Sequence, residues 1–182
     1  LLSDLRARGF SAKVVAAGSV AGLEAARRGE CDLAPVHLFD EKSGEYNRPF
    51  LKDGVSLIPG YGRRQGVVSR DGDESGRMIN RNRRSGTRVL IDGLLGDRRP
   101  DGYELEVRSH QAVAAAVKAG RADWGVCIEN VADGLNFRFL AEERLDFAVP
   151  ESRAQRPAVA AFRLLLLDES VRERLRAAGF VP

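Results

Sequence analysis

One pattern occurs twice in this sequence, and it restricts the chain to folds that contain crossover helices. In each copy a helix-forming stretch ends at a glycine, two further residues lead to an aspartate, and an apolar strand-forming stretch follows; the copies span residues 28–34 and 119–125. A strand-forming stretch also precedes each helix. Since parallel strands need a crossover connection, the two copies predict two βαβ units and therefore two similar α/β lobes.

Apolar periodicity and helix-capping residues give the expected bounds of these units. The first unit is a strand over 11–17, a helix over 20–28 with Ser19 as its N-cap, and a strand over 32–36. The second is a strand over 103–107, a helix over 110–119 capped by Ser109, and a strand over 122–128. The other expected elements are helices over 85–95, 157–167 and 170–178, the last capped by Asp168, and strands over 137–140 and 145–149.

The apolar stretches between the two units set the expected lobe boundaries. Those at 55–58 and 66–69 can carry the chain into the second lobe, and those at 137–140 and 145–149 can return it. We therefore expect lobe 1 to contain residues 1–62 and 139–182, and lobe 2 to contain residues 63–138.

Composition indicates an ordinary globular chain. Of the 182 residues, 43% are hydrophobic and 30% are charged, and no apolar run approaches the roughly 20 residues that span a bilayer. The net charge of +3 suits an anionic partner but does not separate a small oxyanion from nucleic acid. Cys31 and Cys127 are far apart in sequence, which favours two free thiols and a cytoplasmic protein; a periplasmic location would require a signal peptide that has been removed.

Two turns at expected helix starts are the main candidates for ligand contact. They are Gly18-Ser19 and Ser85-Gly86-Thr87. A helix start exposes unpaired N–H groups and the positive end of the helix dipole, so it can hold an oxyanion, while glycine lets the anion approach and hydroxyls add donors. The alternative is that each turn is only a helix cap. Their occurrence in both expected lobes favours ligand binding.

Several other polar residues lie close to these turns in sequence. Arg88 belongs to an arginine run with Arg77, Arg81, Arg83 and Arg84, where one guanidinium can reach an oxyanion and the others form a solvated basic face. His110, His37 and Tyr46 follow expected strand ends, caps or turns, where ligand contacts gather, although each can equally be structural. No aromatic residues interleave the arginines, so nucleic-acid stacking is unsupported.

The sequence offers no support for a catalytic function. Cys31 follows a helix end and Cys127 sits within an expected strand, so neither occupies the helix-start position that activates a thiol. A Ser–His dyad can be drawn, but nothing beyond proximity supports it. There is no Walker loop, no dinucleotide fingerprint and no third clustered Cys or His for zinc. We expect no catalysis, no cofactor and no metal.

Several blocks resemble one known family in the same order along the chain. They are residues 18–23, 29–34, 37–38, 44–49, 64–66, 82–88, 110–114 and 120–125. Together they resemble the periplasmic-binding-protein-like superfamily domain that is related to molybdate and tungstate binding proteins. The resemblance implies a type II fold of two α/β lobes joined by two crossover segments, with a ligand enclosed in the cleft between them. It also implies that the N-terminal strand of the fold is missing here.

The resemblance also implies a function for the domain that contains these candidate residues. Such domains are often attached to helix-turn-helix segments or to molybdopterin-biosynthesis proteins. We expect a sensor domain that captures an oxyanion such as molybdate or tungstate and regulates an attached domain, with DNA as a partner only through a fused helix-turn-helix segment. The alternative is the effector domain of a transcription regulator that recognises a small organic anion. Neither reading involves a membrane.

Overall fold

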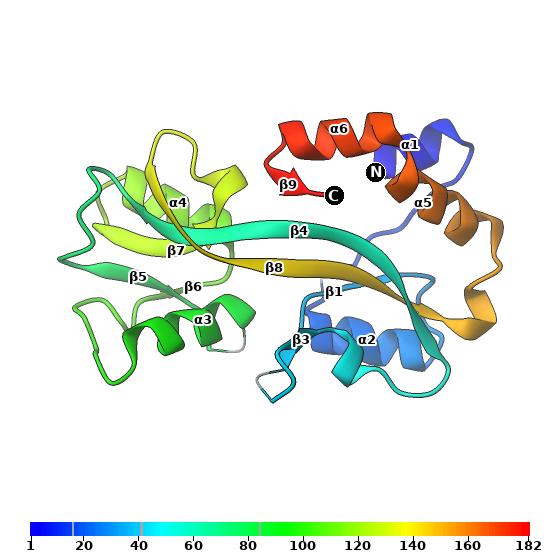
Figure 1. Cartoon of the computed structure of the whole chain (residues 1–182), viewed down its shortest axis with the longest axis horizontal. Coiled ribbons are helices and arrows are strands. Elements are labelled where there is room, and N and C mark those ends of the chain that lie inside the picture. The colour runs from blue at the N-terminus through cyan, green and yellow to red at the C-terminus, as the bar shows by residue number, and fades with distance from the viewer. Residues whose placement is uncertain (16, 41, 84) are drawn as a thin grey trace. The chain divides into compact units, whose positions relative to one another are not determined.

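The computed structural model describes residues 1–15, 17–40, 42–83 and 85–182 and divides the chain into two compact units. Unit 1 is Leu1–Gly62 with Arg144–Pro182, and unit 2 is Arg63–Glu143. The chain passes between the units within strands β4 (Val55–Ser69) and β8 (Asn136–Pro150), as Figure 1 shows. The division of the chain into lobes at 62/63 and 138/139 stays a prediction.

Strand β8 is continuous where the sequence predicted two short strands, and β4 is continuous across the apolar runs at 55–58 and 66–69. Pro59, Gly60 and Gly62 interrupt the apolar pattern of β4, and both residue types commonly end strands. Gly60 instead lies so close to β8 that a Cβ atom there would collide with the carbonyl oxygen of Leu145. The glycine therefore permits close strand contact instead of ending the strand.

Unit 2 contains consecutive crossovers around a central strand. Strand β5 (Met78–Arg81) lies between β6 (Glu106–Val107) and β7 (Trp124–Ile128) and runs parallel to both. Helix α3 (Gly86–Leu95) connects β5 to β6, helix α4 (His110–Lys118) connects β6 to β7, and the short helix η2 (Glu129–Val131) follows. Strand β4 is antiparallel to β7. The predicted βαβ unit is present, although β6 begins only at Glu106 because a turn precedes it.

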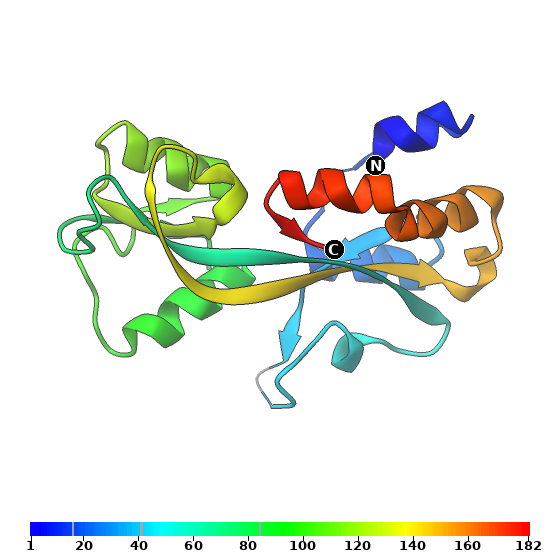
Figure 2. The ribbon, with the colours of Figure 1, turned by 45° about the horizontal axis from the view of Figure 1, so that its top comes forward.

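Alternating side chains of unit 2 bury both faces of its sheet. On one face, α3 covers Val67, Met78 and Val126; on the other, α4 covers Val68, Ile79 and Cys127. Figures 1 and 2 show the two helices on opposite sides of these strands. The period of two along each strand is the reason why adjacent residues join different cores.

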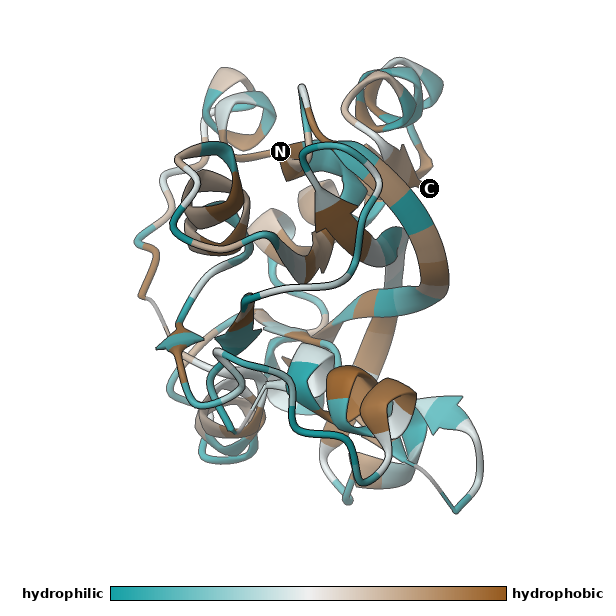
Figure 3. Ribbon diagram, turned by 90° about the vertical axis from the view of Figure 1, so that its left-hand side faces the viewer, coloured by the Kyte–Doolittle hydropathy of each residue, from teal (hydrophilic) through white to brown (hydrophobic). Residues whose placement is uncertain are grey.

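Unit 1 has the same two-faced construction. Strand β1 (Ala34–Val36) pairs antiparallel with β8, which lies beside β4, and β9 (Phe180–Val181) pairs with β4. Ala148 packs with α2 (Ser19–Arg27), whereas Phe147 and Val149 pack with α5 (Pro157–Leu167). Hydrophobic and hydrophilic residues alternate around the helical ribbons (Figure 3), as helices at a core surface require. The remaining elements are α1 (Leu2–Ala7), β2 (Phe39–Asp40), β3 (Glu45–Tyr46), η1 (Arg48–Phe50), η3 (Glu151–Arg153) and α6 (Glu169–Ala177).

The first predicted βαβ unit is wrong. Residues 11–15 and 17 form no strand, and Ala16 lies outside the described residues. Val14 and Val15 are 68% and 73% exposed, so the β-branched pair that favoured a strand buries no face against a neighbour. The strand after α2 pairs antiparallel with β8, so no parallel partner precedes it among the described residues.

The helix-cap predictions were tested at three serine and aspartate positions. Ser109 accepts a hydrogen bond from the backbone N–H of Ala112 at 3.1 Å, and Asp168 caps α6 in the same way through Ser170. The predicted N-cap at Ser19 is wrong, because Gly18 occupies the cap and Ser19 is the first helical residue. Cys31 and Cys127 are both free, and no helix among the described residues is long and apolar enough to cross a membrane.

Replacing Ser109 with alanine will lower the free energy of unfolding by about 1 kcal/mol, since a first-turn N–H loses its acceptor. The same change at Ser43, which lies in an exposed turn, is expected to cost less, because no helix depends on it. Urea unfolding followed by circular dichroism measures both changes. Equal losses would show that the Ser109 cap contributes nothing specific.

Candidate functional site

The helix starts of unit 2 gather at one edge of its sheet. Strand β5 ends at Arg81 shortly before α3, and β6 ends at Val107 shortly before α4. Because β5, β6 and β7 are parallel, their carboxyl ends lie at the same edge, where α/β sheets bind ligands. Gln65 of β4 is paired with Ile128, the last residue of β7, and so belongs there too. We call this region the carboxyl edge of unit 2.

The predicted turn Ser85-Gly86-Thr87 forms a capped helix start at this edge. The Ser85 hydroxyl oxygen accepts from the backbone N–H of Arg88 at 3.2 Å and donates to the carbonyl oxygen of Asn82 at 3.0 Å. Thr87 is buried. The cap employs the Ser85 side chain, so a ligand here would meet the backbone N–H groups of the first turn. Ligand contact by Ser85, Gly86 and Thr87 stays a prediction.

Arg88 is the member of the arginine run that is held most firmly. Its guanidinium donates to Asp92 and Glu106, each at 2.9 Å, and lies over the ring of Tyr103. Burial opposes its charge, but the hydrogen bonds that the guanidinium donates to Tyr103 and Asp92 outweigh burial and raise the pKa of Arg88. The side chain thus joins α3 to β6, and its contact with a ligand stays a prediction.

Arg81 is a buried cation at the carboxyl edge. Its side chain is 7% exposed, Nη1 lies 3.0 Å from Nδ1 of His110, and Nη2 donates to the carbonyl oxygen of Arg108 at 3.4 Å. The buried Nε has no hydrogen-bond partner among the described residues. Because a guanidinium only donates, Nδ1 of His110 must accept, which places the imidazole proton on Nε2. The structure thus brings the predicted His110 to Arg81.

A buried ionic cluster adjoins Arg81 in unit 2. Glu143, 2% exposed, pairs with Arg63 and accepts from the side-chain amide of Gln65. Burial raises the pKa of Glu143, and the charges of Arg63 and Arg81 oppose that rise. Burial also lowers the pKa of Arg81, which Glu143 opposes. The atoms Arg63 Nε and Gln65 Oε1 are buried without a hydrogen-bond partner among the described residues.

The rest of the arginine run lies at the surface. Arg77 pairs with Asp101 at 3.1 Å and Arg83 with Glu104 at 2.9 Å, all four side chains being largely exposed. Arg84 lies outside the described residues. The run is therefore not one basic patch, because its described members are divided between surface ion pairs and two buried positions.

In unit 1 the structure brings two predicted residues together. The Ser19 hydroxyl oxygen lies 2.9 Å from Nδ1 of His37 and accepts from the backbone N–H of His37 at 3.2 Å. The side chain of Ser19 thus joins the first turn of α2 to the segment after β1, while Gly18 precedes it as the N-cap. Ligand contact by these three residues stays a prediction.

Tyr46 lies at the wall of a pocket of about 460 Å³ within unit 1, which Glu45, Arg48, Leu57, Pro59, Arg144 and Asp146 complete. Its ring packs against that of Phe39, with 5.0 Å between the two ring centroids. The neighbouring Asn47 is buried with φ of 62°, and its side chain accepts from Leu38 N–H and donates to Asp146. These bonds hold an unusual backbone conformation beside the pocket. The sequence offered no signal for Asp146.

Reactive and metal-binding groups are scarce in the described chain. Burial raises the pKa of the Cys127 thiol to about 12, which removes the thiolate that a nucleophile needs. Burial likewise raises the pKa of Cys31. Within residues 1–15, 17–40, 42–83 and 85–182, no three His, Cys, Asp or Glu side chains gather to hold a metal ion. The polar groups at the carboxyl edge are suited to binding.

Each unit carries helices on both faces of its sheet, and in unit 2 two helices begin at the carboxyl edge. These features define an α/β ligand-binding domain. The chain matches the model of the PBP superfamily domain over residues 2–167 and belongs to this periplasmic-binding-protein-like family. It is 32% identical over 162 residues to the uncharacterized protein YvgK of Bacillus subtilis (strain 168), covering 76% of this chain and 53% of YvgK. The chain thus spans about half the length of that relative.

Solved structures show the same fold. A putative phosphate ABC transporter substrate-binding protein from Clostridium perfringens, with bound phosphate, is 10% identical with a TM-score of 0.74 and covers 98% of this chain and 92% of that one. A LysR family transcriptional regulator is 11% identical with a TM-score of 0.66, and the match covers 90% of this chain and 58% of the regulator. The predicted type II periplasmic-binding-protein fold is confirmed. The chain is a small-ligand-binding domain of the periplasmic-binding-protein-like family.

Proposed function

We propose that this domain binds a small anion at the carboxyl edge of unit 2, with Arg81 as the main charged contact. The observation that carries the proposal is the buried guanidinium whose Nε has no hydrogen-bond partner among the described residues. It is the last residue of β5 and is held by His110 at the start of α4. Charge-assisted hydrogen bonds and two positive helix ends favour an anion there.

Molybdate or tungstate is the first ligand to test, because the sequence blocks resemble the domain related to molybdate and tungstate binding proteins. A tetrahedral oxyanion has acceptors in every direction, which suits donors from a guanidinium and from helix N–H groups. Gly18, Ser19 and His37 of unit 1 are proposed as additional contacts. The cleft between the lobes, in which these contacts would meet the same ligand, stays a prediction.

A small organic anion is the second candidate, and one observation favours it. The pocket of about 460 Å³ in unit 1 has apolar surfaces from Tyr46, Leu57 and Pro59. Its charged residues are Arg48, Arg144, Glu45 and Asp146, and because Arg144 is paired with Asp146 at 3.2 Å, Arg48 is the arginine that would meet the anion. That volume falls within the range of organic ligand sites, which starts at about 300 Å³. An anion with an apolar body would use both kinds of wall.

The domain is proposed to act as a cytoplasmic sensor for an attached regulatory domain. The LysR family regulator shares the fold over part of its length, which supports a role next to a DNA-binding segment. Such a sensor works only if the ligand binds one conformation more tightly than another. DNA would then be a partner through the attached segment, and catalysis is not part of the proposal.

Isothermal titration calorimetry with molybdate, tungstate, sulfate, phosphate and small carboxylates at constant ionic strength tests the proposal. Arg81→Gln is expected to weaken the tightest anion by about tenfold to a hundredfold, since a hydrogen bond to a charged group contributes about 1.5–3 kcal/mol. Arg77→Gln is the matched control, because Arg77 comes from the same run and pairs at the surface. It should change the dissociation constant less than about twofold.

Two results would contradict the proposal. One is the absence of heat and of thermal stabilisation with every anion. The other is an equal loss of affinity in the Arg81→Gln and Arg77→Gln variants, which would reflect net charge alone. Thermal unfolding of both variants establishes that each is folded at the titration temperature.

A further inference from the structure

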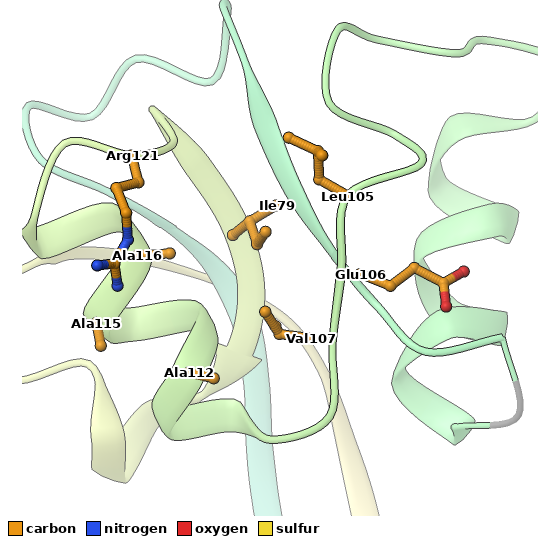
Figure 4. A pocket seen from close by; sticks show the side chains of 8 residues that line it. All are labelled: Ile79, Leu105, Glu106, Val107, Ala112, Ala115, Ala116 and Arg121. Atoms are coloured by element: carbon orange, nitrogen blue, oxygen red, sulfur yellow. The ribbon is translucent and has the colours of Figure 1, made fainter.

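A second pocket lies in unit 2, between helix α4 and the edge strand β6. Its volume is about 520 Å³, and Figure 4 shows the eight side chains that line it. They are Ile79, Leu105, Glu106, Val107, Ala112, Ala115, Ala116 and Arg121. Arg81 is not among them, so this pocket differs from the anion site proposed at the carboxyl edge.

The pocket arises from small side chains on one helix face. Ala112, Ala115 and Ala116 are at helical spacing and line the same side of α4 (Figure 4), so they leave room where larger residues would close onto β6. Ile79 from the central strand β5 adds an apolar wall, and Leu105 is 47% exposed beside it. The walls are therefore mainly apolar, as in most small-molecule sites.

The charge at this pocket is positive. The Glu106 carboxylate is held by Arg88 at 2.9 Å and Arg83 at 3.3 Å, and Figure 4 shows it turned away from the alanine side chains. Arg121 has no hydrogen bond or ion pair through its guanidinium with any described residue. In Figure 4 its side chain runs back along α4 toward Ala115 and Ala116. The cation that is left to pair with a ligand is thus Arg121.

We infer that this pocket binds a small organic monocarboxylate with a branched aliphatic or aromatic body. The body would cover Ile79, Leu105 and Val107, and burial of apolar surface is favourable by about 25 cal/mol per Å². The carboxylate would pair with the guanidinium of Arg121, whose planar fork matches a carboxylate. The ligand class follows from apolar walls combined with one available cation. The inference does not depend on the anion site at Arg81.

The test uses the 182-residue chain and benzoate as the probe, with the neutral benzamide as its matched control. Titrations are followed by ¹H–¹⁵N NMR, in which the amides of α4 and β6 report on the pocket. Benzoate is expected to bind in the millimolar range, with saturable shifts centred on Ala112–Ala116 and Glu106–Val107. Benzamide is expected to bind at least about fivefold more weakly, because it cannot form the ion pair.

Three variants locate the site. Ala115→Leu fills the pocket from an exposed position on α4 and should raise the benzoate dissociation constant about tenfold or more. Arg121→Gln should remove the difference between benzoate and benzamide. Gln111→Leu places the same leucine at an exposed α4 position outside the pocket and should leave binding unchanged.

The outcomes separate this inference from the proposed function. Shifts that remain in Ala115→Leu, or that centre on Arg81 and His110, would place benzoate at the carboxyl edge and overturn the pocket assignment. An absence of saturable shifts up to about 20 mM benzoate, several times a millimolar dissociation constant, would also overturn it. The anion titrations with Arg81→Gln are unaffected by either result, so each idea can fail alone.

Discussion

Replacing Arg63 with methionine will lower the free energy of unfolding by about 3–5 kcal/mol at neutral pH. Glu143 is almost fully buried and forms an ion pair with Arg63, so the variant leaves a carboxylate inside unit 2 without its principal partner. Removing one member of a buried pair is costly because the remaining charge keeps its desolvation penalty. Urea unfolding, followed by tryptophan fluorescence and circular dichroism, measures the loss.

The neighbouring arginine supplies the control for this prediction. Arg64 follows Arg63 in β4 and pairs with Glu129 at 2.9 Å, but both side chains of that pair are substantially exposed. Arg64→Met should cost less than about 1 kcal/mol. The double variant Arg63→Met with Glu143→Gln should recover part of the lost stability, since no buried carboxylate is left without Arg63, while Arg81 loses the nearby charge of Glu143. Equal losses in Arg63→Met and Arg64→Met would contradict the assignment.

The pH dependence of Arg63→Met has a definite sign. Burial raises the pKa of Glu143, and Arg63 is the leading group that opposes the rise, so removing Arg63 raises the folded-state pKa further. A carboxyl group with a raised folded-state pKa contributes stability below its unfolded pKa, and this contribution is lost as pH rises through the folded pKa. The deficit relative to wild type should therefore shrink between neutral pH and about pH 5. A deficit that grows on acidification would contradict this account.

Local signals in the sequence were sufficient for several features of the fold. The bounds of α5 match the prediction because Pro157 begins it and its apolar periodicity is unbroken. The caps at Ser85 and Ser109 were predictable because a capping side chain bonds to a backbone group only three residues away. The parallel arrangement in unit 2 followed from strand, helix and strand occurring in succession.

Features that depend on pairing between distant segments were not predictable. Glu143 and Gln65 belong to different strands, and nothing near either residue indicates that β4 and β8 place them together. The same holds for Asn47 and Asp146 in unit 1. The predicted strand over 11–17 failed for a related reason, because a β-branched run forms a strand only where another strand accepts it.

The candidate site was predicted in part because helix starts are local and ionic partners are not. His110 was selected from its place after Ser109, and it does lie at the carboxyl edge. Arg88 was the predicted ligand contact from the arginine run, and Arg81 was not. The structure shows that Arg88 is held by Asp92 and Glu106, whereas Arg81 has a buried nitrogen without a hydrogen-bond partner among the described residues.

Replacing Gly102 with alanine will destabilise unit 2 by at least about 3 kcal/mol. Gly102 has φ of 82°, which disfavours any side chain, and a Cβ atom there would collide with the carbonyl oxygen of Met78 and approach Cγ of Arg77 to 2.8 Å. The turn that contains Gly102 is bonded to β5, since the side-chain amide of Asn80 donates to the carbonyl oxygen of Tyr103 at 2.9 Å.

Gly72→Ala separates the two causes of this loss. Gly72 has φ of 91° but nothing within 4 Å of an added Cβ, so it carries the conformational cost alone, about 1–2 kcal/mol. Urea unfolding should therefore rank Gly102→Ala well below Gly72→Ala in stability, and hydrogen exchange should show faster opening of β5 only in Gly102→Ala. Because β5 ends at Arg81, the Gly102 variant should also weaken anion binding, whereas Gly72→Ala should not. Equal losses of stability in the two variants would mean that the turn can move away from β5, and the position of Arg81 would then not depend on it.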